Sequence, residues 1–202
     1  MGTICVYEAV TLDGVMQAPG RADEDERGGF AHGGWAVGYD DDVLARFAQR
    51  AMAASTGMLL GVRTYYDLLR HWTAQPRPNP YTDALVDAPK HVVSRDPSTP
   101  LPYPNSTLHA GDAHLTVRRL KESWDGRLTV LGSGEVVASL DEAGLVDEYV
   151  LLVHPVVLGS GHRLFADEHR KDLRLVEAVP TTTGVLACRY AVDHPHPGSA
   201  PV

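Results

Sequence analysis

The segment Gly132-Ser133-Gly134-Glu135 combines two glycines, a hydroxyl and a carboxylate between an apolar strand and an expected helix. Glycine lets the backbone approach a ligand without a Cβ in the way, and the first N–H groups of a helix attract an anion. The Glu135 carboxylate repels a phosphate unless it points outward or caps its own helix. A third glycine, as in the dinucleotide fingerprint G-x-G-x-x-G, is missing from GSGEVV. The segment is therefore either a tight turn or a phosphate cradle.

Two other strand ends carry residues that suit a phosphate. LLGVRTYYDLL offers Gly61, Arg63 and Thr64 at the start of a helix, and HVVSRDP ends a strand in Ser94 and Arg95. Each has a structural alternative, because the arginines suit a solvated surface and the hydroxyls suit helix or turn caps. Three such ends on one edge of a parallel sheet would line one crevice, and together they favour a dinucleotide site.

Hydrophobic periodicity indicates which elements position these residues. Helices alternate with apolar strands, which predicts an α/β fold with a mixed, mostly parallel sheet and an antiparallel C-terminal hairpin around Gly184. The expected strands are Ile4 to Val10, Thr56 to Leu60, Lys90 to Ser94, Ser106 to His109, one ending at Leu131 and one starting near Glu148; the expected helices are Asp42 to Ala54, one after Gly61, one after Asp112 and one from Glu135 to Ala143. The segment from Met16 to Gly34 is predicted to be a long mobile loop.

Composition limits the class of protein. The 202 residues carry a net charge of −8 and no dense Lys/Arg run, which argues against nucleic acid or an anionic membrane as the partner. We predict one domain over residues 1–193 and a flexible tail over 194–202, whose His194 and His196 lie among prolines and indicate no metal site. No apolar run reaches the roughly 20 residues of a membrane span, no signal peptide is evident, and Cys5 and Cys188 suit reduced thiols, so a cytoplasmic location is expected.

Five motifs occur in an order that is recognisable: VTLDG, LLGVRTYYDLL, HVVSRDP, LTVLGSGEVVASL and LVDEYVLLVHPVVLGSGHRLF. With them the chain resembles, from about Thr3 to Val192, the dihydrofolate-reductase-like family that includes the RibD C-terminal reductase domain of riboflavin biosynthesis. The resemblance implies a three-layer fold around a mixed sheet, NADPH as reductant, a small heterocyclic substrate and a homodimer.

The resemblance also implies roles for particular residues. Gly61, Arg63 and Thr64 would contact cofactor phosphates, Ser94 and Arg95 would lie near the adenosine 2′-phosphate, and Gly132, Ser133, Gly134, Glu135 and Val136 would wrap the pyrophosphate. Relatives commonly carry Gly-Arg-x-Thr at the second turn, whereas here Val62 follows Gly61. This shift of one residue points the Arg63 side chain in a different direction from the family arginine, away from a direct phosphate contact. A preference for NADPH therefore depends on Ser94 and Arg95.

The expected chemistry is hydride transfer to a carbon–nitrogen double bond or carbonyl of a pyrimidine- or pterin-like ring, as in 5-amino-6-(5-phosphoribosylamino)uracil reductase. Asp13 is the first candidate to bind substrate or relay a proton, although LDG also forms turns; Asp40 and Asp42 follow, although they suit helix capping. Trp35 is a candidate to cover a planar substrate, or anchors the loop. Alternatives are a dihydrofolate or pterin reductase and a non-catalytic nucleotide- or pterin-binding module.

Overall fold

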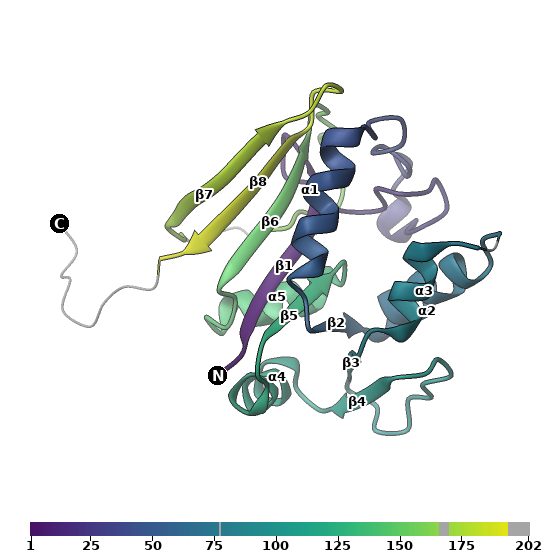
Figure 1. The fold of residues 1–202 in the computed structure, drawn as a ribbon, viewed down its shortest axis with the longest axis vertical. Helices are drawn as coiled ribbons and strands as arrows, with labels where there is room; N and C mark the ends of the chain where they lie inside the picture. Colours follow the sequence, from purple (N-terminus) through teal and green to yellow (C-terminus); the bar gives the residue numbers. More distant parts are fainter. Residues whose placement is uncertain (77, 166–169, 194–202) are drawn as a thin grey trace.

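The computed structural model describes residues 1–76, 78–165 and 170–193 (Figure 1). In chain order its elements are β1 (Thr3–Thr11), the 3-10 turn η1 (Arg27–Gly29), α1 (Asp42–Ala53), β2 (Gly57–Gly61), α2 (Val62–Thr73), α3 (Pro80–Asp87), β3 (Lys90–Ser94), β4 (Ser106–Ala110), α4 (Ala113–Ser123), β5 (Arg127–Leu131), α5 (Gly134–Glu142), β6 (Glu148–His154), β7 (Leu173–Pro180) and β8 (Leu186–Val192).

All the described strands join one sheet in the order β4-β3-β2-β5-β1-β6-β8-β7. The first six in this order run parallel, and β8 pairs antiparallel with both β6 and β7. The predicted fold class, a mostly parallel mixed sheet with an antiparallel C-terminal hairpin, is therefore confirmed. Because the six parallel strands share one direction, Gly61, Ser94 and Leu131 end at the same edge.

Helices cover both faces of the sheet and create the three layers (Figure 1). On one face α1 buries Leu44 and Phe47 against Cys5 and Val150, and α2 and α3 pack on β2 and β3. On the other face α4 and α5 pack on alternate residues of β1 and β5, such as Val6. The continuous burial of β2 and β3 is typical of parallel strands covered on both sides.

Local capping explains where two helices begin. The Asp41 carboxylate accepts a hydrogen bond from the Leu44 N–H and starts α1, as the Asp40-Asp41-Asp42 run predicts. Helix α3 was not predicted, because its segment lies beside the proline-rich QPRPNP. Asn79 caps it through the Thr82 N–H, and Pro80 occupies the first turn, where its missing N–H costs nothing.

The two central strands separate at their carboxyl ends. Strand β1 pairs with β5 only as far as Tyr7 opposite Leu131, but it continues along β6 to Thr11 opposite His154. From Glu8 to Thr11, β1 therefore pairs with β6 but no longer with β5, and Glu8 lies near the Gly132 N–H of the glycine turn after β5. This opening between β1 and β5 positions the site.

The remaining predictions concern the ends of the chain and the membrane. The predicted tail, residues 194–202, lies outside the described residues, and the single domain over 1–193 stays a prediction. None of the helices in the described part of the chain is both long and apolar enough to cross a membrane. Cys5 and Cys188 are buried and not bonded to each other, as expected.

Candidate active site

A cavity of about 790 Å³ lies at the carboxyl edge of the sheet. The middle of β1, the ends of β2, β3 and β5, the first turns of α2, α4 and α5, and the loop after β1 all line it. In open α/β sheets ligands bind in the crevice at this edge. Every cofactor-binding residue proposed from the sequence lines this cavity: Gly61, Arg63, Thr64, Ser94, Arg95, Gly132, Ser133, Gly134, Glu135 and Val136.

The glycine turns after β2 and β5 are joined by one hydrogen bond. The Gly61 N–H donates to the Ser133 hydroxyl at 2.8 Å. A Cβ on Gly61 would lie 3.2 Å from Val136 Cγ2, and a Cβ on Gly132 would lie 3.1 Å from Thr64 Cγ2, so larger residues would crowd this contact. Gly132 and Ser133 both have left-handed backbones, with φ of 57° and 66°. Ser133 thus acts as an acceptor that holds two turns together, where the sequence suggested a donor to phosphate.

The first turn of α5 supplies the anion-binding part of the cavity. Gly134 and Glu135 are its first residues and both line the cavity, and the first N–H groups of a helix have no intrahelical partner. The N-cap residue Ser133 makes no side-chain capping bond, and the acidic residue of this turn is Glu135. It points outward, 77% exposed, so the predicted repulsion of a phosphate is reduced.

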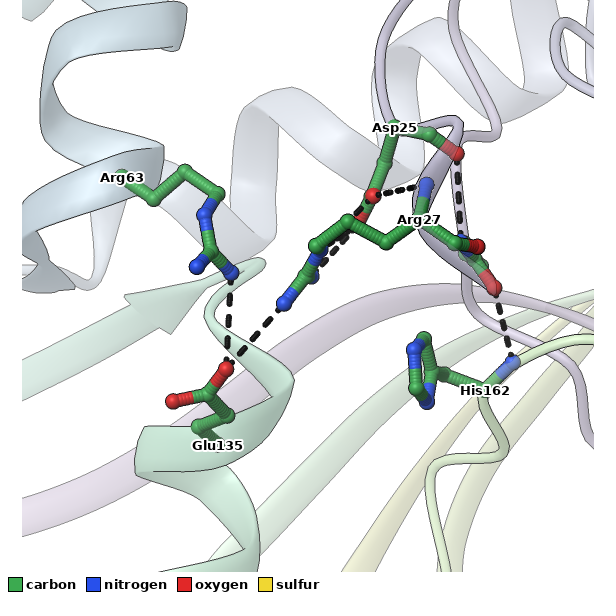
Figure 2. A network of polar contacts seen from close by, with 6 residues as sticks. Asp25, Arg27, Arg63, Glu135 and His162 are labelled. Carbon is green, nitrogen blue, oxygen red and sulfur yellow. Dashed lines mark hydrogen bonds and ion pairs between the residues drawn. The ribbon is translucent and has the colours of Figure 1, made fainter. Parts of the chain in front are cut away.

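Glu135 instead bridges two arginines at the mouth of the cavity (Figure 2). Its Oε1 accepts from Arg27 Nη1 at 3.1 Å and from Arg63 Nη1 at 3.4 Å. Arg27 also forms an ion pair with Asp25 on the loop after β1. The Arg63 side chain is therefore paired with a carboxylate. This agrees with the expectation that the shift of this arginine by one residue points its side chain in a different direction.

Ser94 and Arg95 at the end of β3 differ in the contacts that their side chains make. The Ser94 hydroxyl is engaged with the Thr99 hydroxyl at 2.7 Å and accepts from the Asp96 N–H, so it shapes the turn. Arg95 lines the cavity, is exposed, and forms no ion pair with any residue that the structure describes. A guanidinium in this state can take a phosphate in a bidentate fashion.

The candidate acids from the sequence lie elsewhere. Asp13 does not line the cavity; it accepts from the Thr11 hydroxyl at 2.6 Å and from the Gly159 N–H at 2.7 Å, and ties β1 to the segment after β6. These bonds, that of the Thr11 hydroxyl first, lower the pKa of Asp13 to about 2, which does not suit a group that must carry a proton at neutral pH. Asp42 is exposed in the first turn of α1, also outside the cavity lining, and so is Asp40.

Trp35 anchors the loop after β1. It is 9% exposed, packs with Val15, Ala18 and Phe30, and its Nε1 donates to the Gln17 carbonyl at 2.7 Å. Its ring stands edge-on to His154, 5.2 Å between centroids. The structure does not bring Trp35 to the cavity wall, so the alternative of a loop anchor is the better interpretation.

Sequence reasoning missed Glu8. This carboxylic acid lies in the middle of β1, is 5% exposed and lines the cavity, and its Oε1 has no hydrogen-bond partner among the described residues. Burial, and then the charge of Glu24, raises the pKa of Glu8 well above 4.5, whereas the nearby Gly132 N–H lowers it. The signal in the sequence was an acid inside the apolar run ICVYEAV.

The lining residues fit a nicotinamide dinucleotide. Gly61 and Gly132 present backbone to the cavity without a Cβ, the α5 N-terminus suits a pyrophosphate, and Arg95, which forms no ion pair with a described residue, can take a further phosphate. No group of three or more His, Cys, Asp or Glu side chains within residues 1–76, 78–165 and 170–193 is arranged to hold a metal ion.

Comparison with known proteins agrees with this fold. The family model described as the RibD C-terminal domain matches residues 3–187. The uncharacterized protein YyaP of Bacillus subtilis is 33% identical over 103 residues, which are 50% of this chain and 53% of that protein, so the match spans about half of each.

Two solved structures resemble the chain over most of its length. A putative riboflavin biosynthesis protein from Shewanella sp. PV-4 has a TM-score of 0.66 at 19% identity and covers 95% of this chain and 99% of that one. Dihydrofolate reductase from Enterococcus faecalis, in a complex with NADP(H), has a TM-score of 0.57 at 12% identity, with 95% and 97% covered. At these identities the two structures establish the shared fold.

Proposed function

We propose, from the premise that this chain belongs to the RibD C-terminal domain family, that it is an NADPH-dependent reductase of a pyrimidine- or pterin-like heterocycle. The family is one of NAD(P)H-dependent reductases with a dihydrofolate-reductase-like fold. The hydrogen bond between Gly61 and Ser133 is the observation that carries the proposal, because it joins two glycine turns into one wall of the cavity.

Different residues of the chain would bind different parts of the cofactor. Gly61, Thr64 and the turn from Gly132 to Val136 would hold the pyrophosphate, and Arg95 would take the 2′-phosphate that distinguishes NADPH from NADH. When bound, NADPH supplies the hydride. Ser94 shapes the turn that presents Arg95, and we assign it this supporting role.

The loop after β1 would close the substrate end. Gln17 is buried and its side chain donates to the carbonyls of Asp25 and Arg27 and accepts from the His162 N–H, so the loop is held to the segment after β6. Such a covered site excludes water and holds the reacting carbons in register, which is most of what a hydride transfer requires from the protein.

NADPH oxidation tests the proposal. The purified protein is mixed with NADPH and with a panel of pyrimidines and pterins, including the phosphoribosylamino-uracil type, and the loss of nicotinamide absorbance is followed. Turnover with at least one ring supports a reductase. Saturable binding of rings without any turnover would instead favour the non-catalytic binding module.

A pterin is a second candidate substrate, and Glu8 favours it. A buried carboxylic acid in the cavity suits a ring with adjacent N–H groups, and here the acid comes from β1 rather than from a helix. A homodimer stays a prediction; the outer strand β7 exposes Leu175 and Val176, which is compatible with a second copy, and light scattering on a sizing column measures it.

A further inference from the structure

His154 is the last residue of β6, and its side chain lies against the segment that precedes α1. Its ring meets the rings of Trp35 and Tyr39 edge to face, with 5.2 Å and 5.4 Å between the centroids and interplanar angles of 86° and 89°. His154 is 3% exposed. The two aromatic side chains therefore help to shield the imidazole from water.

The contacts of the ring suit a neutral imidazole. Nδ1 of His154 lies 2.9 Å from the Leu152 carbonyl oxygen, which only accepts, so Nδ1 carries the hydrogen. Burial lowers the pKa of His154, and the Leu152 and Val10 carbonyls and the Asp40 carboxylate offset only part of this effect. The enclosed ring is therefore uncharged at neutral pH.

The ionisable groups around this end of β6 are carboxylates and a phenol. Asp40 and Tyr39 belong to the segment before α1, Asp41 caps α1, and Asp13 follows β1. Asp13 and Asp41 are each held by hydroxyl and backbone N–H donors. The first residues of β8, which pair with the end of β6, are apolar. Among the described residues, Asp40 is thus the available counter-charge for a protonated His154.

A short series of contacts connects His154 to the cavity. Trp35, which touches the His154 ring, donates from Nε1 to the Gln17 carbonyl at 2.7 Å. Gln17 is buried and lines the cavity, and its side chain binds the carbonyls of Asp25 and Arg27. A displacement of Trp35 would therefore move the loop after β1 where it borders the cavity.

We propose that His154 is a positioning residue for this loop: its neutral ring holds Trp35 in place, and a proton on the ring releases the loop from the cavity. This rests on the proposed reductase function, because the loop closes the substrate end of the same cavity. An imidazolium at this depth has lost its hydration, and it regains water only when Trp35 and Tyr39 move away. That movement breaks the bond between Trp35 and Gln17.

The pH range follows from the state that binds the proton. With the loop closed, the pKa of His154 lies below its ordinary value of 6.5, whereas a ring released to water has the ordinary value. Between these two values the open form binds more protons than the closed form. The ratio of open to closed chains should therefore rise up to about tenfold for each pH unit of acidification, and should not change above about pH 6.5.

Nuclear magnetic resonance tests this without cofactor or substrate. The indole N–H signal of Trp35 and the ring signals of His154 are followed in the labelled full chain from about pH 7.5 to about pH 5.5. Trp35→Phe identifies the indole signal. We expect this signal to move toward the position of a water-exposed indole, in step with the titration of His154. An indole signal that stays constant over this range would overturn the proposal.

Two variants assign the response to His154. His154→Gln keeps an N–H donor and His154→Phe keeps a ring, and neither takes up a proton in this range, so both should abolish the response of Trp35. The control is His71→Gln on α2, where the histidine also lies beside a tryptophan, Trp72; it should leave the response unchanged. A response that persists in either folded His154 variant would contradict the role. The titration of the parent chain decides the question if neither variant folds.

Kinetics separate positioning from a purely structural role. With a substrate found by NADPH oxidation, KM should rise as the pH falls below about 6.5 in the parent chain and stay constant in His154→Gln. An equal rise in both would contradict the proposal. If no ring is reduced while the Trp35 signal responds, the reductase proposal fails and the role of His154 in the loop stands. If NADPH is oxidised and the Trp35 signal stays constant, the role of His154 fails alone.

Discussion

The backbone N–H of Gly61 donates to the side-chain hydroxyl of Ser133, 72 residues further along the chain. This bond fixes the turn after β2 against the turn after β5, at the point where the cavity begins. Ser133 adopts a left-handed backbone to do so, which an L-residue other than glycine adopts at a cost of about 1–2 kcal/mol. The left-handed backbone of Ser133 and its hydrogen bond to Gly61 therefore occur together in the turn after β5.

Two substitutions at Ser133 separate the hydroxyl from the backbone. Ser133→Ala loses the bond and keeps the strain, whereas Ser133→Gly loses the bond and relieves the strain. We expect both to bind NADPH about fivefold more weakly, and the glycine variant to be more stable than the alanine variant by about 1 kcal/mol. Chemical denaturation and NADPH titration measure the two effects; equal stability of the variants would argue against strain at Ser133.

Arg95 should determine the preference for NADPH. Its side chain lines the cavity without an ion pair in the described part of the chain, so Arg95→Gln should weaken NADPH about 10–100-fold and leave NADH unchanged. Arg118→Gln, at an exposed position of α4, is the matched control. An equal loss for both coenzymes in the Arg95 variant would show that this arginine does not contact the 2′-phosphate.

Glu135 should oppose the binding of an anion. Glu135→Gln removes a carboxylate from the first turn of α5 and releases Arg27 and Arg63, which lie 3.1 Å and 3.4 Å from it. We expect NADPH to bind about 2–5-fold more tightly at low salt, and the gain to shrink as salt screens these exposed charges. Weaker binding in the variant would mean that Glu135 itself is needed to position the loop.

Glu8 should make stability fall as the pH rises. Its pKa is raised in the folded state, so between its ordinary value of 4.5 and its folded value the folded chain binds more protons than the unfolded chain. The stabilisation is complete below pH 4.5 and is lost as the pH rises through the folded pKa. Melting temperatures from about pH 5 to about pH 8 should therefore fall less steeply for Glu8→Gln than for the parent chain. Parallel curves would contradict the raised pKa.

Asp13 should affect the stability of the folded chain and not the pH dependence of the reaction. Asp13→Asn weakens the bonds from the Thr11 hydroxyl and the Gly159 N–H, so the melting temperature should decrease. With a pKa of about 2 the carboxylate is ionised at every working pH, so the pH profile of NADPH oxidation should keep its shape. A profile that changes shape in this variant would restore Asp13 as a proton relay.

The sequence predicts the fold well because its signals are local and periodic. The apolar strands, the Asp41 cap and the hairpin around Gly184 each depend on residues that are near neighbours in the chain. Helix α3 was missed because prolines beside it masked a good Asn-Pro start. The glycine turns were predicted as one cleft for a related reason, since parallel strands must end at the same edge.

The polar residues of the site were harder to predict, because their roles depend on long-range contacts. Asp13 looked like a substrate ligand at a strand end, and only the fold shows that the backbone after β6 occupies its carboxylate. Trp35 has the same explanation, since its partners are Gln17, 18 residues earlier in the same loop, and His154 on β6. Glu8 was visible as an acid in an apolar strand, but its access to the cavity follows from the early end of its pairing with β5.

Calorimetric titration of the chain with NADPH and with NADH tests the central claim most directly, because it measures the dinucleotide cleft without requiring the substrate. We predict saturable binding of one NADPH per chain, with NADH at least about 10-fold weaker. The absence of heat and of saturation with both coenzymes at millimolar concentrations would contradict the account.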